Sequence, residues 1–210
     1  MRARDTGRIA RAMVSFMPAP LRRLARGREG AGAVEFAILV PLLLVGYIGA
    51  YELSVAMSVY NKVGRSASTI SDLLTQGSSV GNDEFNNARM AANTILAPYQ
   101  VSADNLSYEI VGIQIDDDGN ATVAWSRDEH DNWVTSMTKG TTVPLPEDMT
   151  KTKSFIVMTT VTMDYKIELV EKVLPFLRGS STTEILDPTL KRTSYSRLRK
   201  GNELQCSVCT

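Results

Sequence analysis

The sequence is poor in the residues from which catalytic and metal sites are usually built. Its 210 residues include one histidine, His130, and two cysteines, Cys206 and Cys209. It has no Gly-x-Ser-x-Gly stretch, no glycine-rich phosphate loop and no His/Glu spacing typical of a metal site. The usual arrangements of nucleophile and general base therefore cannot be assembled, and we expect neither an enzyme nor a cofactor.

Charged residues are also missing from one long stretch near the N-terminus. Between Phe36 and Tyr51 there is none, and residues 31–60 carry only Glu35 and Glu52. As a helix these residues would be about 45 Å long, because each residue adds about 1.5 Å, and a hydrocarbon core is about 30 Å thick. The stretch is therefore predicted to cross a membrane once.

The net charge is zero, but the charges are unevenly distributed along the chain. Residues 1–30 hold eight arginines against two acids, whereas residues 61–210 hold 15 basic and 19 acidic side chains. Arginines next to an apolar segment keep that end in the cytoplasm, so everything after about residue 55 should lie outside the cytosol. A nucleic-acid-binding arm is disfavoured because the basic residues lead directly into the apolar segment.

Three kinds of processing are compatible with this N-terminus. The segment can remain as an uncleaved anchor, or it can be a secretory signal cut after Ala50. It can also be cut on the cytoplasmic side, after Gly30. Only the last explains Glu35, because a carboxylate in a bilayer costs roughly 2.5–3.5 kcal/mol and needs a partner, and a new α-amino group at Ala31 on a neighbouring subunit would supply one.

The residues around this junction resemble a known family. Gly30, the sequence AGAV and then Glu35 and Phe36 lie between arginines and an apolar helix, as in the class III signals of type IV prepilins. More narrowly, REGAGAVEFAILVPLLL is similar to the start of TadE-like proteins, minor pilins or pseudopilins of the Tad (Flp) pilus. The resemblance is strong over residues 27–65. It is weaker over VTMDYKIELVEKVLPFLRG and KRTSYSRLRKG.

The resemblance implies a maturation step and a set of partners. A prepilin peptidase would cut between Gly30 and Ala31, which makes Glu35 the fifth residue of the mature chain. The partners implied are other Tad pilus subunits, inner-membrane assembly proteins and the lipid bilayer. The expected orientation has a cytoplasmic N-terminus and a periplasmic C-terminal domain, and the mature protein would either stay in the inner membrane or enter the pilus base or fibre.

Small residues within the apolar segment indicate a face for helix packing. Gly46 and Ala50 are four residues apart and Gly49 lies beside them, so another helix could approach closely there. Glycines are also common in membrane helices for no such reason, and the sequence does not separate the two explanations. Pro41 removes one helical hydrogen bond and should kink the helix.

The fold class predicted from periodicity is α+β. One helix is expected over about residues 33–76, and a second from Asp83 to Pro98, because their apolar residues recur at spacings of three and four. Alternating residues predict strands near 106–110, 121–125, 155–165 and 191–199, which form an antiparallel sheet of about four strands. The phase slip near Gly112 predicts a bulge. A short helix is expected over 168–177, and residues 127–153 are interpreted as a long polar connection.

Two further sets of residues could form a functional site, but a structural role is favoured for both. DDDGN, residues 116–120, is predicted to be a turn, because in the register of a calcium loop Trp125 would occupy the position that needs glutamate. Cys206 and Cys209 form a Cys-x-x-Cys pair, and for an exported tail a disulfide, within the pair or to a partner, is favoured over free thiols or redox activity.

The sequence thus predicts three segments: a leader over residues 1–30, a transmembrane helix over 31–60 and an α+β head domain over 61–210. The function predicted is assembly into or with a Tad-type pilus. The alternatives are an uncleaved single-pass protein whose head binds a periplasmic partner, and a redox protein that uses the two cysteines.

Overall fold

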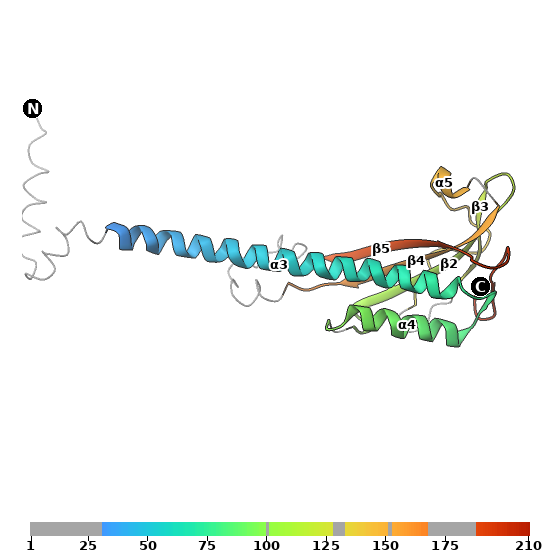
Figure 1. The fold of residues 1–210 in the computed structure, drawn as a ribbon, viewed down its shortest axis with the longest axis horizontal. Coiled ribbons are helices and arrows are strands. Elements are labelled where there is room, and N and C mark those ends of the chain that lie inside the picture. The colour runs from blue at the N-terminus through green and yellow to red at the C-terminus, as the bar shows by residue number, and fades with distance from the viewer. Residues whose placement is uncertain (1–30, 100, 128–132, 151–152, 168–187) are drawn as a thin grey trace, which may run out of the picture. The chain divides into compact units, whose positions relative to one another are not determined.

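The computed structural model describes residues 31–99, 101–127, 133–150, 153–167 and 188–210 (Figure 1). It divides between Ala50 and Tyr51 into two units, each of which is considered by itself. The first is represented by the beginning of helix α3 (Ala31–Leu74), and the second, Tyr51–Thr210, is called here the C-terminal unit. The expected helix over 168–177 and the leader over 1–30 lie outside the described residues.

Two long helices belong to the C-terminal unit, and both were predicted. The last part of α3 is followed by α4 (Asn82–Leu96). Asp83 and Glu84 lie in the first turn of α4, where carboxylates complement the helix dipole, and Glu84 accepts a 2.8 Å hydrogen bond from the Gly81 amide. At the other end Lys62 of α3 donates from Nζ to the carbonyls of Ile95 (3.0 Å) and Ala97 (2.6 Å). These bonds satisfy carbonyls that α4 leaves unpaired and fix α4 against α3.

The sheet has four antiparallel strands in the order β3-β2-β4-β5. Their bounds are β2 (Leu106–Ile115), β3 (Ala121–Ser126), β4 (Ser154–Asp164) and β5 (Thr189–Arg197). The α+β prediction is therefore confirmed. Three short elements were not predicted: β1 (Ser79–Val80), which pairs in parallel with β6 (Gln205–Cys206), and the helical turn α5 (Glu147–Thr150).

One face of the sheet is covered by α3 and α4. The core on this face consists of apolar side chains from both helices and from three strands, and most of them are fully buried: Val59, Val63, Ala67, Ile70, Leu74, Phe85, Ala88, Ala92, Leu96, Leu106, Tyr108, Ile110, Trp125, Phe155, Val157, Val161 and Met163. On α3 and α4 these residues recur at spacings of three and four, which is the stripe that an amphipathic helix presents to a core.

The opposite face is also covered, by the segment that was predicted to be only a polar connection. Met137, Leu145 and Met149 from this segment pack against a second apolar cluster made of Val111, Ile113, Ile115, Ala121, Val123, Val143, Ile156 and Met158. Trp133, from the same segment, is 2% exposed within the helix-face core. Strands β2 and β4 are therefore buried on both faces, so apolar side chains occupy both sets of alternating positions along parts of these strands.

A bulge in β3 moves one large side chain to the helix face. Gly112 pairs with Trp125 and Ile113 with Val123, so Ala124 is the extra residue, whereas β2 stays in continuous register with β4. Val123 and Trp125 consequently point to opposite faces although they are two residues apart. The bulge was expected near Gly112, and the structure assigns the additional residue to the partner strand.

Strand β5 contacts α3 mainly through polar groups. Ser194 Oγ lies 3.2 Å from Ser68 Oγ, and Ser196 Oγ donates to Asp72 Oδ1 at 3.0 Å. Arg192, on the same strand, donates to the Tyr60 hydroxyl oxygen at 2.9 Å. We call these contacts the polar seam.

Gly112 lies against the rings of Trp125 and Phe155, so adding a side chain there tests how tightly this part of the core is packed. A Cβ there would lie 2.4 Å from Cε2 of Trp125 and 2.8 Å from Cζ of Phe155, closer than packed atoms allow. These two rings stack with their centroids 6.2 Å apart. We expect Gly112→Ala to lower the stability by about 1–3 kcal/mol through overpacking, measured as a lower Tm in the near-ultraviolet circular dichroism of the full chain in detergent.

The matched control is Ser107→Thr, which adds one methyl group to a half-buried position of the same strand. It should change Tm by much less. Equal Tm values for wild type and Gly112→Ala would contradict the role given to Gly112.

Candidate functional site

The first candidate site is the exposed apolar part of α3. Twelve large apolar side chains between Val34 and Met57 are 45–72% exposed: Val34, Phe36, Ile38, Leu39, Leu42, Leu43, Leu44, Val45, Tyr47, Tyr51, Leu53 and Met57. A helix that is apolar on all sides has to be buried in a membrane or against other helices. This helix contains a segment long and apolar enough to cross a membrane, with a mean hydropathy of 2.1 and no part of that window buried by the chain itself.

The proposed processing junction lies at the beginning of this helix. Ala31 is the first residue of α3, and Glu35 and Phe36 are exposed within its first two turns. Gly30 lies outside the described residues. Glu35 thus lies at the start of an apolar surface. If this surface is buried in a membrane or against other helices, the carboxylate needs a positively charged partner.

The small residues Gly46, Gly49 and Ala50 are also exposed on α3. A Cβ built at either glycine would meet nothing within 4 Å, so the chain itself does not use these positions for close packing. Gly46 and Ala50 share a helix face because they are four residues apart. The geometry leaves that face available to another helix.

The second candidate site is the C-terminal tail, which is built into the C-terminal unit. Leu204 is fully buried, and its carbonyl accepts a 2.7 Å hydrogen bond from Nε1 of Trp125. Ser126 and Thr210 exchange backbone hydrogen bonds of 2.8 and 3.1 Å. The tail therefore closes the end of β3 and shields Trp125.

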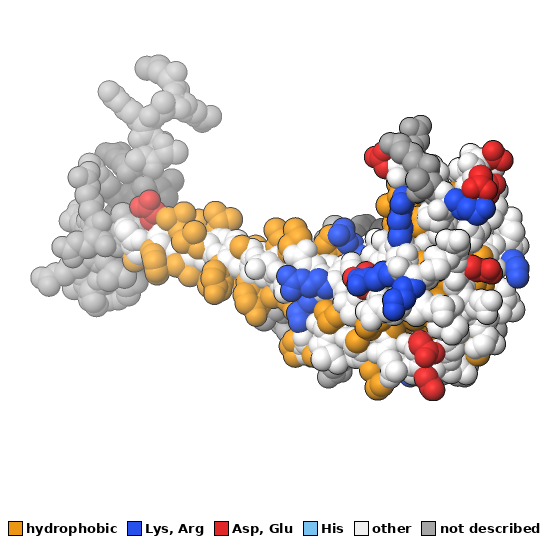
Figure 2. Space-filling model, turned by 45° about the vertical axis from the view of Figure 1, so that its right-hand side comes forward, with side chains coloured by type: hydrophobic (Ala, Val, Ile, Leu, Met, Phe, Trp, Pro, Cys, Tyr) orange, Lys and Arg blue, Asp and Glu red, His pale blue; other side chains and the backbone are white. Residues whose placement is uncertain are grey.

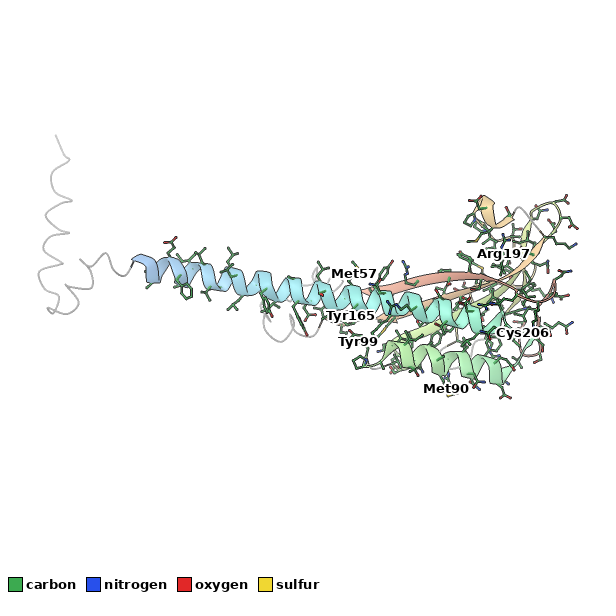
Figure 3. All side chains as sticks on the ribbon, viewed as in Figure 1. Met57, Met90, Tyr99, Tyr165, Arg197 and Cys206 are labelled. Carbon is green, nitrogen blue, oxygen red and sulfur yellow. A yellow bond between two sulfur atoms is a disulfide. The ribbon has the colours of Figure 1, made fainter. Side chains whose placement is uncertain are left out.

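A disulfide joins Cys206 and Cys209 within this tail, with the two Cα atoms 5.6 Å apart. Both cysteines are half-buried against the helix-face core. The bond closes a small loop around Val208. Figure 3 shows Cys206 on the strand segment beside the end of α3.

Arg127 holds this tail to the rest of the unit, and its side chain is 8% exposed. Its guanidinium donates to the Val208 carbonyl at 2.7 Å and to Oδ1 of Asn82 at 3.0 Å, and it lies 4.9 Å from the centre of the Phe85 ring. Sequence reasoning missed Arg127 and the burial of Trp133, because both occur in or next to a polar stretch. A tryptophan in such a stretch was the one available signal of a packed segment.

The titratable groups with altered pKa values have structural explanations. Burial raises the pKa of the Tyr108 hydroxyl, which donates to Asn93 Oδ1 at 2.6 Å. The side-chain and backbone hydrogen bonds from Asn120 lower the pKa of Asp116, whose carboxylate closes the predicted DDDGN turn. The Asp117 carboxylate, 2.8 Å away, raises the pKa of Lys153.

Tyr108, Asp116 and Lys153 thus take part in packing, in a turn and in a surface ion pair. Within the ranges that the structure describes, no three His, Cys, Asp or Glu side chains come together in a way that could hold a metal ion. His130 lies outside those ranges. The main features of the described residues are an exposed apolar helix with a carboxylate near its first residue and, following it in the sequence, a packed α+β unit.

Comparison with known proteins agrees with the resemblance seen at the junction. Residues 30–71 match the family model described as TadE-like protein. No curated protein and no solved structure matches the chain. The matched residues include Glu35, the apolar part of α3 and much of its packed part, but none of the sheet. The chain is therefore similar to the TadE-like family over residues 30–71, which confirms over this stretch the resemblance predicted from its sequence.

Proposed function

We propose that the chain is a minor pilin or pseudopilin-like component of Tad (Flp) pilus assembly. The observation that carries the proposal is α3: its first part is apolar on all sides and exposed, and the match to the TadE-like family covers this part. Such a helix acts by moving from lipid into contact with other helices. The mechanism proposed is assembly and not turnover of a substrate.

Before assembly, the apolar part of α3 anchors the chain in the inner membrane as a single span. The eight arginines of residues 1–30 favour a cytoplasmic N-terminus, because positive charge next to a span is retained on that side. The C-terminal unit then lies in the periplasm, where its disulfide is compatible with an oxidising compartment.

Maturation consists of one cut by a prepilin peptidase between Gly30 and Ala31. The cut removes the leader with its eight arginines, which keep the N-terminus in the cytoplasm. It also creates a positively charged α-amino group at Ala31. Glu35 of one subunit pairs with the new amine of a neighbour, which offsets the cost of placing a carboxylate in an apolar environment. The cut thus supplies a positively charged partner for Glu35.

In the assembly, the face with Gly46, Gly49 and Ala50 is the surface on which another helix packs closely. The C-terminal unit remains outside this helix contact. Its surface is available to other Tad pilus subunits and to inner-membrane assembly proteins.

Orientation gives the first test of this proposal. Protease added to spheroplasts that lack the peptidase should digest residues 61–210 and leave a fragment that contains the leader, because only the C-terminal unit is outside. The digestion is followed with antibodies against each end. Full protection of the C-terminal region would contradict the orientation.

Cleavage gives the second test, with residue Gly30. Coexpression with its cognate peptidase should yield a chain that begins at Ala31 and has lost 30 residues, as measured by intact mass. Gly30→Leu should prevent the loss, because a bulky side chain obstructs the residue before the scissile bond.

Two masses would reject the pilin-like function. An uncut wild-type chain would mean a simple membrane anchor, and a chain that begins at Tyr51 would mean ordinary secretion. Gly46→Leu is the matched control, since it places the same side chain within α3 and should leave cleavage unchanged.

Glu35 gives the third test. Glu35→Ala should still be inserted and cut, but its recovery in complexes with other pilus subunits should fall about tenfold or more, since an unpaired amine would be left in an apolar interface. Glu35→Asp keeps the charge and should retain more assembly than Glu35→Ala. Normal recovery of the alanine variant would make Glu35 an incidental residue.

A further inference from the structure

A hollow of about 900 Å³ lies on the C-terminal unit, and every charged side chain among the described residues that line it is positive. Its walls come from α3, the end of α4 and β5: Asn61, Lys62, Gly64, Arg65, Ser68, Thr69, Ile95 and Arg192. The charged members are Lys62, Arg65 and Arg192, all positive. The volume is in the range of sites that hold small molecules, about 300–1,000 Å³.

None of these cations is neutralised by an acid among the described residues. Lys62 donates to two carbonyls at the end of α4, which fix its position but leave its charge. Arg192 lies 4.7 Å from the centre of the Tyr60 ring and donates to its hydroxyl oxygen. Arg65 is exposed beside them. Because the charged side chains that line the hollow are all positive, an anion in it would be stabilised.

Glycine at position 64 makes room for this arrangement. A Cβ there would lie 3.1 Å from Nε of Arg192, so the guanidinium rests directly on the α3 backbone. Two of the three cations are therefore held in place by the fold, by the α4 carbonyls and by the Tyr60 ring. A preorganised pair of cations loses less side-chain freedom when an anion binds.

The hollow occurs where the apolar surface of α3 ends. Met57 is the last exposed large apolar residue before it. Lys62 is five residues further along the helix and Arg65 eight, which is about 7.5 Å and about 12 Å of rise. The polar headgroup layer adds about 5–7 Å to each side of a bilayer, and long basic side chains can reach back toward it. Figure 2 shows basic side chains in blue on the C-terminal unit, next to apolar side chains in orange.

Three tyrosines lie at the same end of the C-terminal unit, as expected for residues near the polar headgroup layer. Tyr60 lies under Arg192, and Tyr99 and Tyr165 form an edge-to-face pair with centroids 6.2 Å apart. Figure 3 shows Tyr99 and Tyr165 close together near Met57. Tyrosine is enriched where a membrane meets water, because its ring is apolar and its hydroxyl is polar.

We propose that this hollow binds the phosphate of an anionic phospholipid headgroup and so holds the C-terminal unit against the membrane surface. The proposal rests on the insertion of the apolar part of α3 described under the proposed function. Arg65 and Arg192 contact the phosphate oxygens, and Lys62 contributes its charge. An acidic protein segment is a poorer fit, because the hollow lies within reach of the headgroup layer.

The test is lipid binding by the full chain in neutral detergent, followed by native mass spectrometry during titration with phosphatidylglycerol or phosphatidylcholine. The wild type should retain more phosphatidylglycerol. Arg65→Gln with Arg192→Gln should weaken phosphatidylglycerol binding about tenfold or more, because each basic residue near an anionic surface contributes to the attraction. The matched control is Lys153→Gln with Lys200→Gln, which removes two positive charges from exposed positions outside the hollow and should bind like the wild type.

Three results would overturn the inference. These are equal retention of the two lipids, equal loss in both double variants, and displacement of phosphatidylglycerol by inorganic phosphate at similar concentration, which would indicate a site for free anions. Cleavage after Gly30 is measured on the same variants. Normal cleavage with no lipid preference rejects only this inference, whereas failed cleavage of the wild type rejects the proposed function.

Discussion

The contact between one face of α3 and the sheet is the interaction on which the rest of the C-terminal unit depends. Val59, Val63, Ala67 and Ile70 are fully buried there, and Leu74 is 1% exposed. Before Glu52 the described side chains of the same helix are almost all exposed and apolar, and from Glu52 onward one side of the helix is buried. The packed part of α3 also holds the end of α4 in place through Lys62.

Much of this fold could be predicted from the sequence, because the relevant signals are local. The periodicity of α3 and α4, the alternation over residues 155–165 and the DDDGN turn each depend on neighbours in the chain. The family resemblance at Gly30, Glu35 and Phe36 is likewise carried by a short stretch, and the match over residues 30–71 agrees with it. Cleavage after Gly30, pairing of Glu35 and helix packing at Gly46 each involve a second protein, so they do not follow from the fold of one chain.

Other features depend on contacts between distant residues and could not be predicted. Arg127 is followed by polar residues, and only the fold brings Val208 and Asn82 to its guanidinium. Residues 133–150 contain few apolar side chains, yet those few cover the second face of the sheet. Arg192 is 127 residues from Arg65, so no local pattern could place the two in one hollow.

The polar seam between β5 and α3 has a consequence for how the unit opens. Ser194 and Ser196 donate hydrogen bonds to helix side chains, and water could replace these bonds. Separating α3 from β4 would instead expose Val157 and Val161. The least costly fluctuation of the unit is therefore the release of β5 from the edge of the sheet, with the remaining strands and both helices still packed. Amide hydrogens of β5 should then exchange with solvent earlier than those of β2 and β4, although all three strands belong to one sheet.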